Sequence, residues 1–162
     1  MIIMANSEFH TVRGYQLLEQ NKNKLTSAME DYLEMIYRNS KEDGYIRINI
    51  LADQLHVKAA SASRMVQKLG EMGLLNYRKY EIILLNENGK KLGEYLLERH
   101  LVIENFLKLI NCDEDLLQQT ELMEHSINPR TVDKIKILNS FFSSNKNISD
   151  IFIEFQKEFE CN

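Results

Sequence analysis

The sequence has few of the residues that mark several classes of protein. Only two of its 162 residues are cysteine, Cys112 and Cys161, which excludes a disulfide scaffold and a zinc site built on a Cys-x-x-Cys pair. One proline and six glycines are too few for the turns of a β-sandwich and favour helices. No apolar run approaches the ~18–20 residues that span a bilayer, and the N-terminus lacks a signal pattern. We therefore expect a mainly helical, cytoplasmic protein with no membrane partner.

The charges are unevenly distributed along the chain, although the formal net charge is only −4. Residues 56–80 hold five basic residues and one acid, whereas residues 111–162 hold five basic and ten acidic residues. The basic stretch is suited to a polyanion. The acidic stretch is either a solvated surface or a place that holds cations.

Hydrophobic periodicity in the first half of the chain predicts a helix, two shorter helices and a hairpin. They cover residues 25–38, 50–55, 61–72, and 74–78 with 82–86. Thr26 or Ser27 is the expected N-cap of the first helix, and Asn49 that of the second. Gly73 is expected to end the third helix, because glycine adopts positive φ most easily. Helix, helix, turn, helix and hairpin is the order of a winged helix-turn-helix.

The second half of the chain is predicted to be entirely helical. The expected helices cover residues 88–110, 113–126, 129–142 and 148–159. Acids are expected in the first turn of the second of these helices, where they oppose the helix dipole. Asn128 and Pro129 are typical of the N-cap and first residue of a helix, and residues 143–147 are expected to form a loop.

The helix over residues 61–72 is predicted to read DNA, because a helix fits the ~12 Å major groove and its polar side chains reach base edges. The candidate DNA-binding residues lie on this helix, just before it and along the hairpin: Lys58, Ser61, Ser63, Arg64, Gln67, Lys68, Arg78, Lys79 and Tyr80. Arginine grips guanine with two hydrogen bonds, and glutamine does the same for adenine. The alternative is a solvated helix face on a winged helix that binds only protein partners.

Acids and histidines recur at helical spacing in three segments, which predicts a metal site. The pairs are Asp31 with Glu34 and His100 with Glu104, and the third segment is Glu121, Glu124 and His125. Carboxylate and imidazole ligands without a thiolate suit Mn²⁺ or Fe²⁺. Each segment also has an ordinary interpretation: a solvated acidic face, a hydrogen-bonded core histidine, or plain surface. Spacing alone does not bring the three segments together.

Several ordered motifs resemble the diphtheria toxin repressor family. Residues 28–37 (AMEDYLEMIY) resemble its first helix, and residues 64–69 (RMVQKL) resemble its recognition helix in the manganese transport regulator branch. Residues 88–93, 98–101 and 121–125 continue the match in register, so it runs from about residue 25 to residue 142.

The resemblance implies a homodimer that binds a palindromic operator in double-stranded DNA. It implies a winged-helix domain over residues 25–90, a helical metal-binding and dimerisation domain over residues 91–162, and an extension over residues 1–24. It also implies two Mn²⁺ ions per subunit, with Fe²⁺ as the alternative, and carries the family's ligands onto Asp31, Glu34, His100, Glu121, Glu124 and His125. The iron-responsive branch has cysteine where Glu121 stands. Leu117 stands where that branch has a further histidine, so its ancillary site is expected to be absent.

The implied function is a metal-dependent repressor of manganese uptake genes, with no small organic substrate. Metal would join the first helix to the dimerisation domain and so restrict the spacing of the two recognition helices. A two-metal hydrolase is the enzymatic alternative, but no phosphate loop or nucleophile motif accompanies the acids, so we expect no enzyme. An iron-responsive regulator, or a winged-helix regulator that needs no metal, is the remaining alternative.

Overall fold

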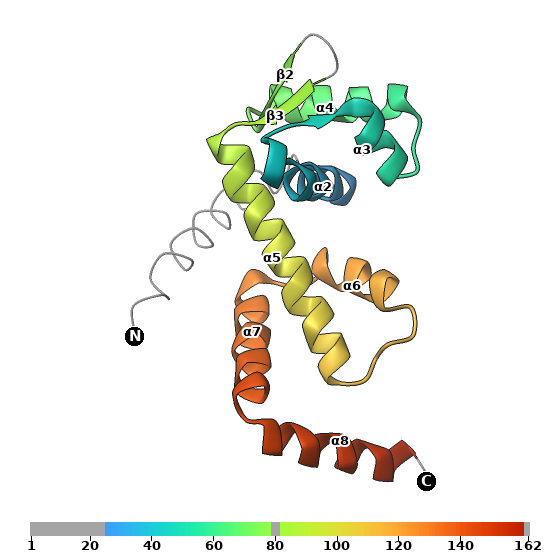
Figure 1. Ribbon diagram of the computed structural model, residues 1–162, viewed down its shortest axis with the longest axis vertical. Helices are drawn as coiled ribbons and strands as arrows, with labels where there is room; N and C mark the ends of the chain where they lie inside the picture. The colour runs from blue at the N-terminus through green and yellow to red at the C-terminus, as the bar shows by residue number, and fades with distance from the viewer. Residues whose placement is uncertain (1–24, 79–81, 161–162) are drawn as a thin grey trace. The chain divides into compact units, whose positions relative to one another are not determined.

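The computed structural model describes residues 25–78 and 82–160 (Figure 1). The chain divides into two compact units, a first that ends at Glu98 and a second that begins at Arg99. The helices and strands are α2 (Ser27–Asp43), β1 (Ile46–Arg47), α3 (Ile48–Gln54), α4 (Ala59–Glu71), β2 (Leu75–Arg78), β3 (Ile82–Leu85), α5 (Glu87–Leu109), α6 (Leu116–Glu124), α7 (Pro129–Ser144) and α8 (Lys146–Glu160). The predicted fold class, a winged helix-turn-helix followed by helices, is confirmed.

Helix α2 begins and ends where its sequence provides partners for the free backbone groups. The Thr26 side chain accepts a hydrogen bond from the Met29 backbone N–H at 3.3 Å, as an N-cap does. Gly44, with φ of 74°, lies just after the helix, and its N–H donates to the carbonyl of Ser40. The helix ends five residues later than predicted, at Asp43 instead of residue 38. Thr26 is confirmed as its cap.

Helix α3 begins without a side-chain cap. Its N-cap residue is Arg47, which makes no capping hydrogen bond, so the prediction that Asn49 caps this helix is wrong. The reason is that β1 runs directly into α3, which places Asn49 inside the helix. The following helix α4 ends at Glu71, and Gly73 lies just beyond its C-cap with φ of 70°, as predicted for the residue that terminates the helix.

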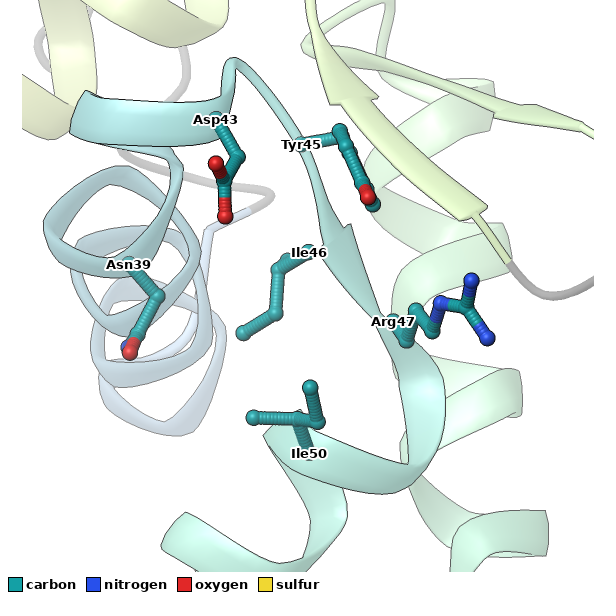
Figure 2. Close-up of a pocket in the computed structure, with 6 residues that line it drawn as sticks. All are labelled: Asn39, Asp43, Tyr45, Ile46, Arg47 and Ile50. Atoms are coloured by element: carbon teal, nitrogen blue, oxygen red, sulfur yellow. The ribbon is translucent and has the colours of Figure 1, made fainter.

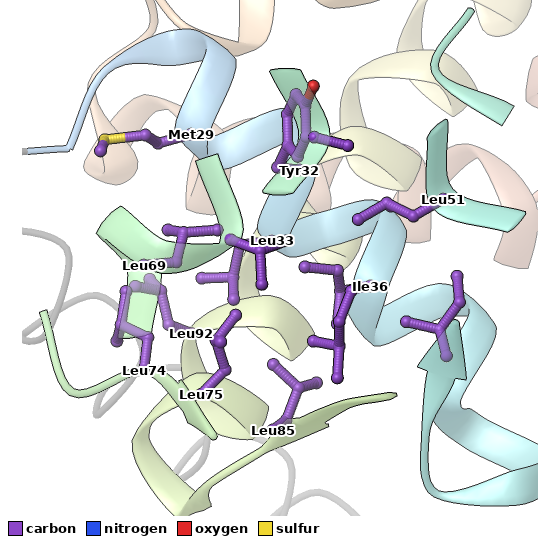
Figure 3. Close-up of a cluster of buried hydrophobic side chains, with 14 of the residues drawn as sticks. Met29, Tyr32, Leu33, Ile36, Leu51, Leu69, Leu74, Leu75, Leu85 and Leu92 are labelled. Carbon is purple, nitrogen blue, oxygen red and sulfur yellow. The ribbon is translucent and has the colours of Figure 1, made fainter. Parts of the chain in front are cut away.

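The predicted hairpin is present, and a third strand joins it. β3 pairs antiparallel with β2 through Leu75–Leu85 and with β1 through Ile46–Ile83, giving the strand order β1-β3-β2. One face of this sheet covers a core of leucines and isoleucines from α2, α3, α4 and α5 (Figure 3). Leu33 and Ile36 of α2 are completely buried there. This core fixes α4 on the first unit with its opposite face exposed.

The second unit departs from prediction at two helix boundaries. α6 begins at Leu116 and has no acid in its first turn, so the prediction of a helix from residue 113 with acidic first-turn residues is wrong. Asp115 adopts left-handed backbone angles (φ 50°, ψ 35°), which interrupts any helix begun at Asp113. The predicted loop over residues 143–147 is also wrong, because only Asn145 separates α7 from α8. The Asn128 cap is confirmed, since its side chain accepts from the Arg130 N–H at 2.9 Å.

Polar side chains tie the helices of the second unit together. The Asn139 amide of α7 donates to the Val102 carbonyl of α5 at 2.8 Å. The Gln156 amide of α8 donates to the Ile110 carbonyl at 3.0 Å. Large apolar side chains nevertheless remain exposed on α6, α7 and α8, among them Leu117, Leu122, Ile137, Ile151, Phe155 and Phe159. None of the described helices combines the length and apolarity that crossing a bilayer requires.

Candidate nucleic-acid interface and metal centre

Helix α4 presents a polar face opposite the side that packs on the core. Ala62, Val66 and Leu69 are completely buried. The five predicted DNA-reading side chains of this helix lie on its other sides, with Ser61, Arg64, Gln67 and Lys68 exposed and Ser63 half-buried. The buried positions recur at three- and four-residue steps and so hold the helix by one stripe. The exposed face keeps the donors and acceptors that base edges and phosphates need.

The start of α4 is also suited to a phosphate. Lys58 is the N-cap residue, is exposed and makes no side-chain capping bond, and the first turn contains no acid. The backbone N–H groups of a helix start attract anions. Of the predicted wing residues, Arg78 ends β2, where it pairs with Ile82. Lys79 and Tyr80 lie outside the described residues.

A shallow hollow elsewhere in the first unit has no part in these predictions. Its volume is about 220 Å³, and Figure 2 shows its lining residues between the end of α2, β1 and the start of α3. Asp43 and Arg47 are the charged side chains among the lining residues. No predicted DNA-binding or metal-binding residue lines it.

The two candidate ligands of the first unit lie on α2. Asp31 and Glu34 are three residues apart and so point the same way. Asp31 is half-buried, and Glu34 is 8% exposed. Arg38, one turn further along the same helix, donates to the Glu34 carboxylate at 2.5 Å. This contact holds the Glu34 side chain at a defined place on the helix.

The four candidate ligands of the second unit come together between α5 and α6. The Nδ1 atom of His100 lies 3.0 Å from Oε2 of Glu124, and both side chains are buried. The other oxygen of Glu124, Oε1, lies 3.7 Å from Nε2 of His125. Glu121, Glu124 and His125 each offer a ligand atom within 4.8 Å of the others. This cluster contains oxygen and nitrogen donors only, which fits a divalent cation such as Mn²⁺ or Fe²⁺.

Glu104, also predicted as a possible ligand from its spacing to His100, pairs instead with a lysine. Its carboxylate accepts from Lys108 at 2.9 Å on the surface of α5. The spacing of Glu104 from its lysine is that of an ordinary helix-surface ion pair.

One residue of the cluster was missed by the sequence analysis. Arg99 is only 4% exposed, and its Nη2 atom lies 3.5 Å from Nδ1 of His125. Its signal in the sequence was a charged residue within a helix whose neighbours are mostly apolar, directly before a candidate ligand. A buried charge of this kind is rare unless it has a partner.

Comparison with known proteins assigns both units to one family. Residues 24–83 match the family described as the iron dependent repressor, N-terminal DNA binding domain. Residues 86–153 match the iron dependent repressor, metal binding and dimerisation domain. A curated relative, the HTH-type transcriptional regulator MntR of Shouchella clausii, is 38% identical over 133 residues, which are 82% of this chain and 93% of the relative.

Solved structures give the same assignment. The manganese regulator SloR aligns with a TM-score of 0.60 and 33% identity over 68% of this chain, and the match spans about half (53%) of SloR. The regulator ScaR, solved with bound Zn²⁺, aligns with a TM-score of 0.58 and 27% identity over 70% of this chain and 54% of its own length.

Proposed function

The chain belongs to the diphtheria toxin repressor family of iron-dependent repressors, which are metal-dependent DNA-binding transcriptional regulators and not enzymes, and we propose that it responds to Mn²⁺ and represses genes of manganese uptake. The cluster of His100, Glu121, Glu124 and His125 carries this proposal. Its matched relative SloR is a manganese regulator by description.

The donor set of the cluster favours Mn²⁺. Carboxylate oxygens and imidazole nitrogens bind manganese and iron well, whereas thiolates select softer ions. Glu121 stands where the iron-responsive branch carries a cysteine, so the cluster has an additional hard, negatively charged oxygen donor. Fe²⁺ remains the second candidate, because its ligand preferences overlap with those of Mn²⁺ and the family takes its name from iron.

Asp31 and Glu34 complete the proposed ligand set, with two ions per subunit. This part of the proposal rests on the resemblance of residues 28–37 to the family's first helix. Four carboxylates brought to one place repel one another unless positive charge lies between them. Bound Mn²⁺ would supply that charge, and α2 would then be held to the dimerisation domain.

The proposed operator is palindromic, because a homodimer presents two copies of α4. Two recognition helices fit two half-sites only at a spacing of one helical turn, ~34 Å, or a multiple of it. If metal restricts the distance between the two recognition helices, a larger fraction of the dimers has the spacing that binds DNA. For a useful switch the metal must bind this population more tightly by a few kcal/mol. We assign the base and phosphate contacts to Arg64, Gln67 and Lys68. We place the action of the protein in the cytoplasm, where this DNA lies.

The test measures operator affinity with and without metal. A fluorescent operator, selected from a library of palindromic duplexes, is titrated with the protein in Mn²⁺ and in EDTA, and binding is followed by anisotropy. We expect tight binding in Mn²⁺ only. His125→Ala should abolish the metal response, and Glu154→Gln, which removes an exposed acid of α8, should leave it unchanged. Equal affinity of the wild type in Mn²⁺ and EDTA would refute the switch.

The same titration separates the alternatives. Under anaerobic conditions Fe²⁺ is substituted for Mn²⁺, and a lower activating concentration of Fe²⁺ would assign the protein to iron. DNA binding by protein shown to be metal-free would indicate a regulator that needs no metal.

A further inference from the structure

Three side chains of the cluster, His100, Glu124 and His125, form a continuous chain of contacts that ends at Arg99. His100 Nδ1 lies 3.0 Å from Glu124 Oε2, and Glu124 Oε1 lies 3.7 Å from His125 Nε2. The other ring nitrogen of His125, Nδ1, lies 3.5 Å from Nη2 of Arg99. All of these residues belong to the second unit, and Arg99 and Glu124 are buried. Both nitrogens of His125 therefore have a protein neighbour.

The arginine determines which nitrogen of His125 carries the proton. A guanidinium has five N–H donors and no acceptor. The contact is therefore a hydrogen bond only in the neutral tautomer in which Nδ1 of His125 accepts and Nε2, which faces the Glu124 carboxylate, carries the ring proton. In this arrangement neither nitrogen of His125 offers a lone pair to a cation. Ligation through Nε2 would move the proton to Nδ1, where it would meet the N–H of Arg99.

The Nδ1 atom of His100 faces an acceptor instead of a donor. Its Nδ1 faces a carboxylate, which accepts a proton and so leaves the lone pair of the ring on Nε2. A histidine whose far nitrogen is held by a carboxylate is oriented for metal binding. The two histidines of the cluster therefore differ, because Nδ1 of His100 faces a carboxylate and Nδ1 of His125 faces an arginine.

The positive charge of Arg99 opposes metal binding, as its N–H donors do. A guanidinium is positively charged at every physiological pH. This charge lies across the imidazole ring of His125 from Glu124, because Nδ1 of that ring faces Arg99 and Nε2 faces Glu124. A divalent cation placed among the same ligands would be repelled by it, with little solvent to screen the interaction.

We propose that Arg99 competes with the divalent cation for this site: it occupies His125 in the metal-free protein, and it must release His125 before that side chain ligates. The inference rests on the proposed function. Arg99 thereby raises the metal concentration at which the regulator responds. It is a positioning residue and not a ligand.

The test uses the full-length protein and two substitutions that remove the charge of Arg99. Arg99→Met also removes the donors at similar length, whereas Arg99→Gln leaves a shorter polar side chain whose amide both donates and accepts. Arg130→Met, at an exposed arginine of the same unit, is the matched control. Thermal unfolding establishes that each variant is folded.

The first measurement reads the tautomer of His125 in metal-free, ¹⁵N-histidine-labelled protein. We expect the wild type and the control to show one tautomer with the proton on Nε2. Arg99→Met should show a mixture or the other tautomer, because the donor to Nδ1 is gone. A wild-type protein with the proton on Nδ1 would overturn the proposal.

The second measurement is the affinity for Mn²⁺ alone, by calorimetry. Both substitutions should tighten binding at least about tenfold, the usual effect of one close charge on a neighbouring ionic equilibrium, and the control should match the wild type. Unchanged or weaker binding in the variants, with the wild type binding Mn²⁺, would overturn the role of Arg99 only. Wild-type protein that binds no Mn²⁺ would overturn the proposed function. If Arg99→Met does not fold, the affinity of Arg99→Gln decides.

Discussion

Replacement of Glu124 by glutamine is the most informative single change in the cluster, because it removes a charge and keeps the shape. The Glu124 side chain is 1% exposed, and its Oε2 atom lies 3.0 Å from Nδ1 of His100. A glutamine in the same place keeps one amide oxygen that accepts from His100. Its amide nitrogen replaces the other oxygen, the one near His125, and that nitrogen can neither accept a hydrogen bond nor ligate a metal ion.

The size of the effect follows from these contacts. A hydrogen bond to a charged acceptor contributes about 1.5–3 kcal/mol and a neutral one about 0.5–1.5 kcal/mol, so Glu124→Gln should lower the free energy of unfolding by about 1 kcal/mol. Glu124→Ala should cost more, about 3 kcal/mol, because it leaves the buried Nδ1–H of His100 without an acceptor and opens a cavity. Loss of a negatively charged ligand should weaken Mn²⁺ binding by at least about 100-fold in both variants.

Two assays on the same samples separate stability from binding. Urea unfolding of the metal-free proteins gives the free energy of unfolding, and calorimetry gives the affinity for Mn²⁺. Glu154→Gln, an exposed acid of the same unit, should change neither. Wild-type affinity for Mn²⁺ in a folded Glu124→Gln protein would refute the assignment of Glu124 as a ligand.

Three further predictions concern the first unit. Gly89→Ala should lower the free energy of unfolding by about 3 kcal/mol in urea titrations, because the added Cβ would overlap the backbone carbonyl oxygen of Leu74. Arg64→Ala should weaken operator binding about 10- to 100-fold in anisotropy without changing thermal stability, since the side chain is exposed. Burial and then the Glu94 carboxylate raise the pKa of Tyr37 above 10.0. The stability that this shift contributes is fully present below pH 10.0 and is lost as the pH rises through the higher pKa of the folded state. The free energy of unfolding, measured against pH in the wild type and in Tyr37→Phe, would detect this loss.

The winged helix was predictable because its signals are local. Apolar residues at three- and four-residue steps determined α2 and α4, and Gly73 marked the end of α4 by a property of its own backbone. Strand β1 has only two residues and was not part of the predicted hairpin. Its pairing with β3 joins residues 46 and 83, and no local pattern in two residues predicts such a partner. Asp115 shows the converse, because its left-handed conformation overrides a local acidic pattern that favours a helix start.

Spacing named the members of the candidate cluster but not the contacts among them. It placed Glu121, Glu124 and His125 on one side of a helix and paired His100 with Glu104, and the resemblance then grouped His100 with the first three. The approach of His100 to Glu124 joins residues 24 positions apart in sequence, and it depends on how α5 packs on α6. Arg99 was missed for the same reason, since only that packing brings it to His125.

A purely structural role for Glu124 is difficult to reconcile with its energetics. Burial of a carboxylate is costly, and replacement of a buried ionic group by well-packed apolar residues is often neutral or stabilising. The surrounding helices contain such apolar positions, for example the completely buried Ile103 of α5. Glu124 lies between two imidazoles, and an arginine lies beside one of them. Burial of these groups between two helices therefore costs more free energy than apolar packing would. The proposed cation site would account for this arrangement, because a bound cation offsets the charge of the buried carboxylate.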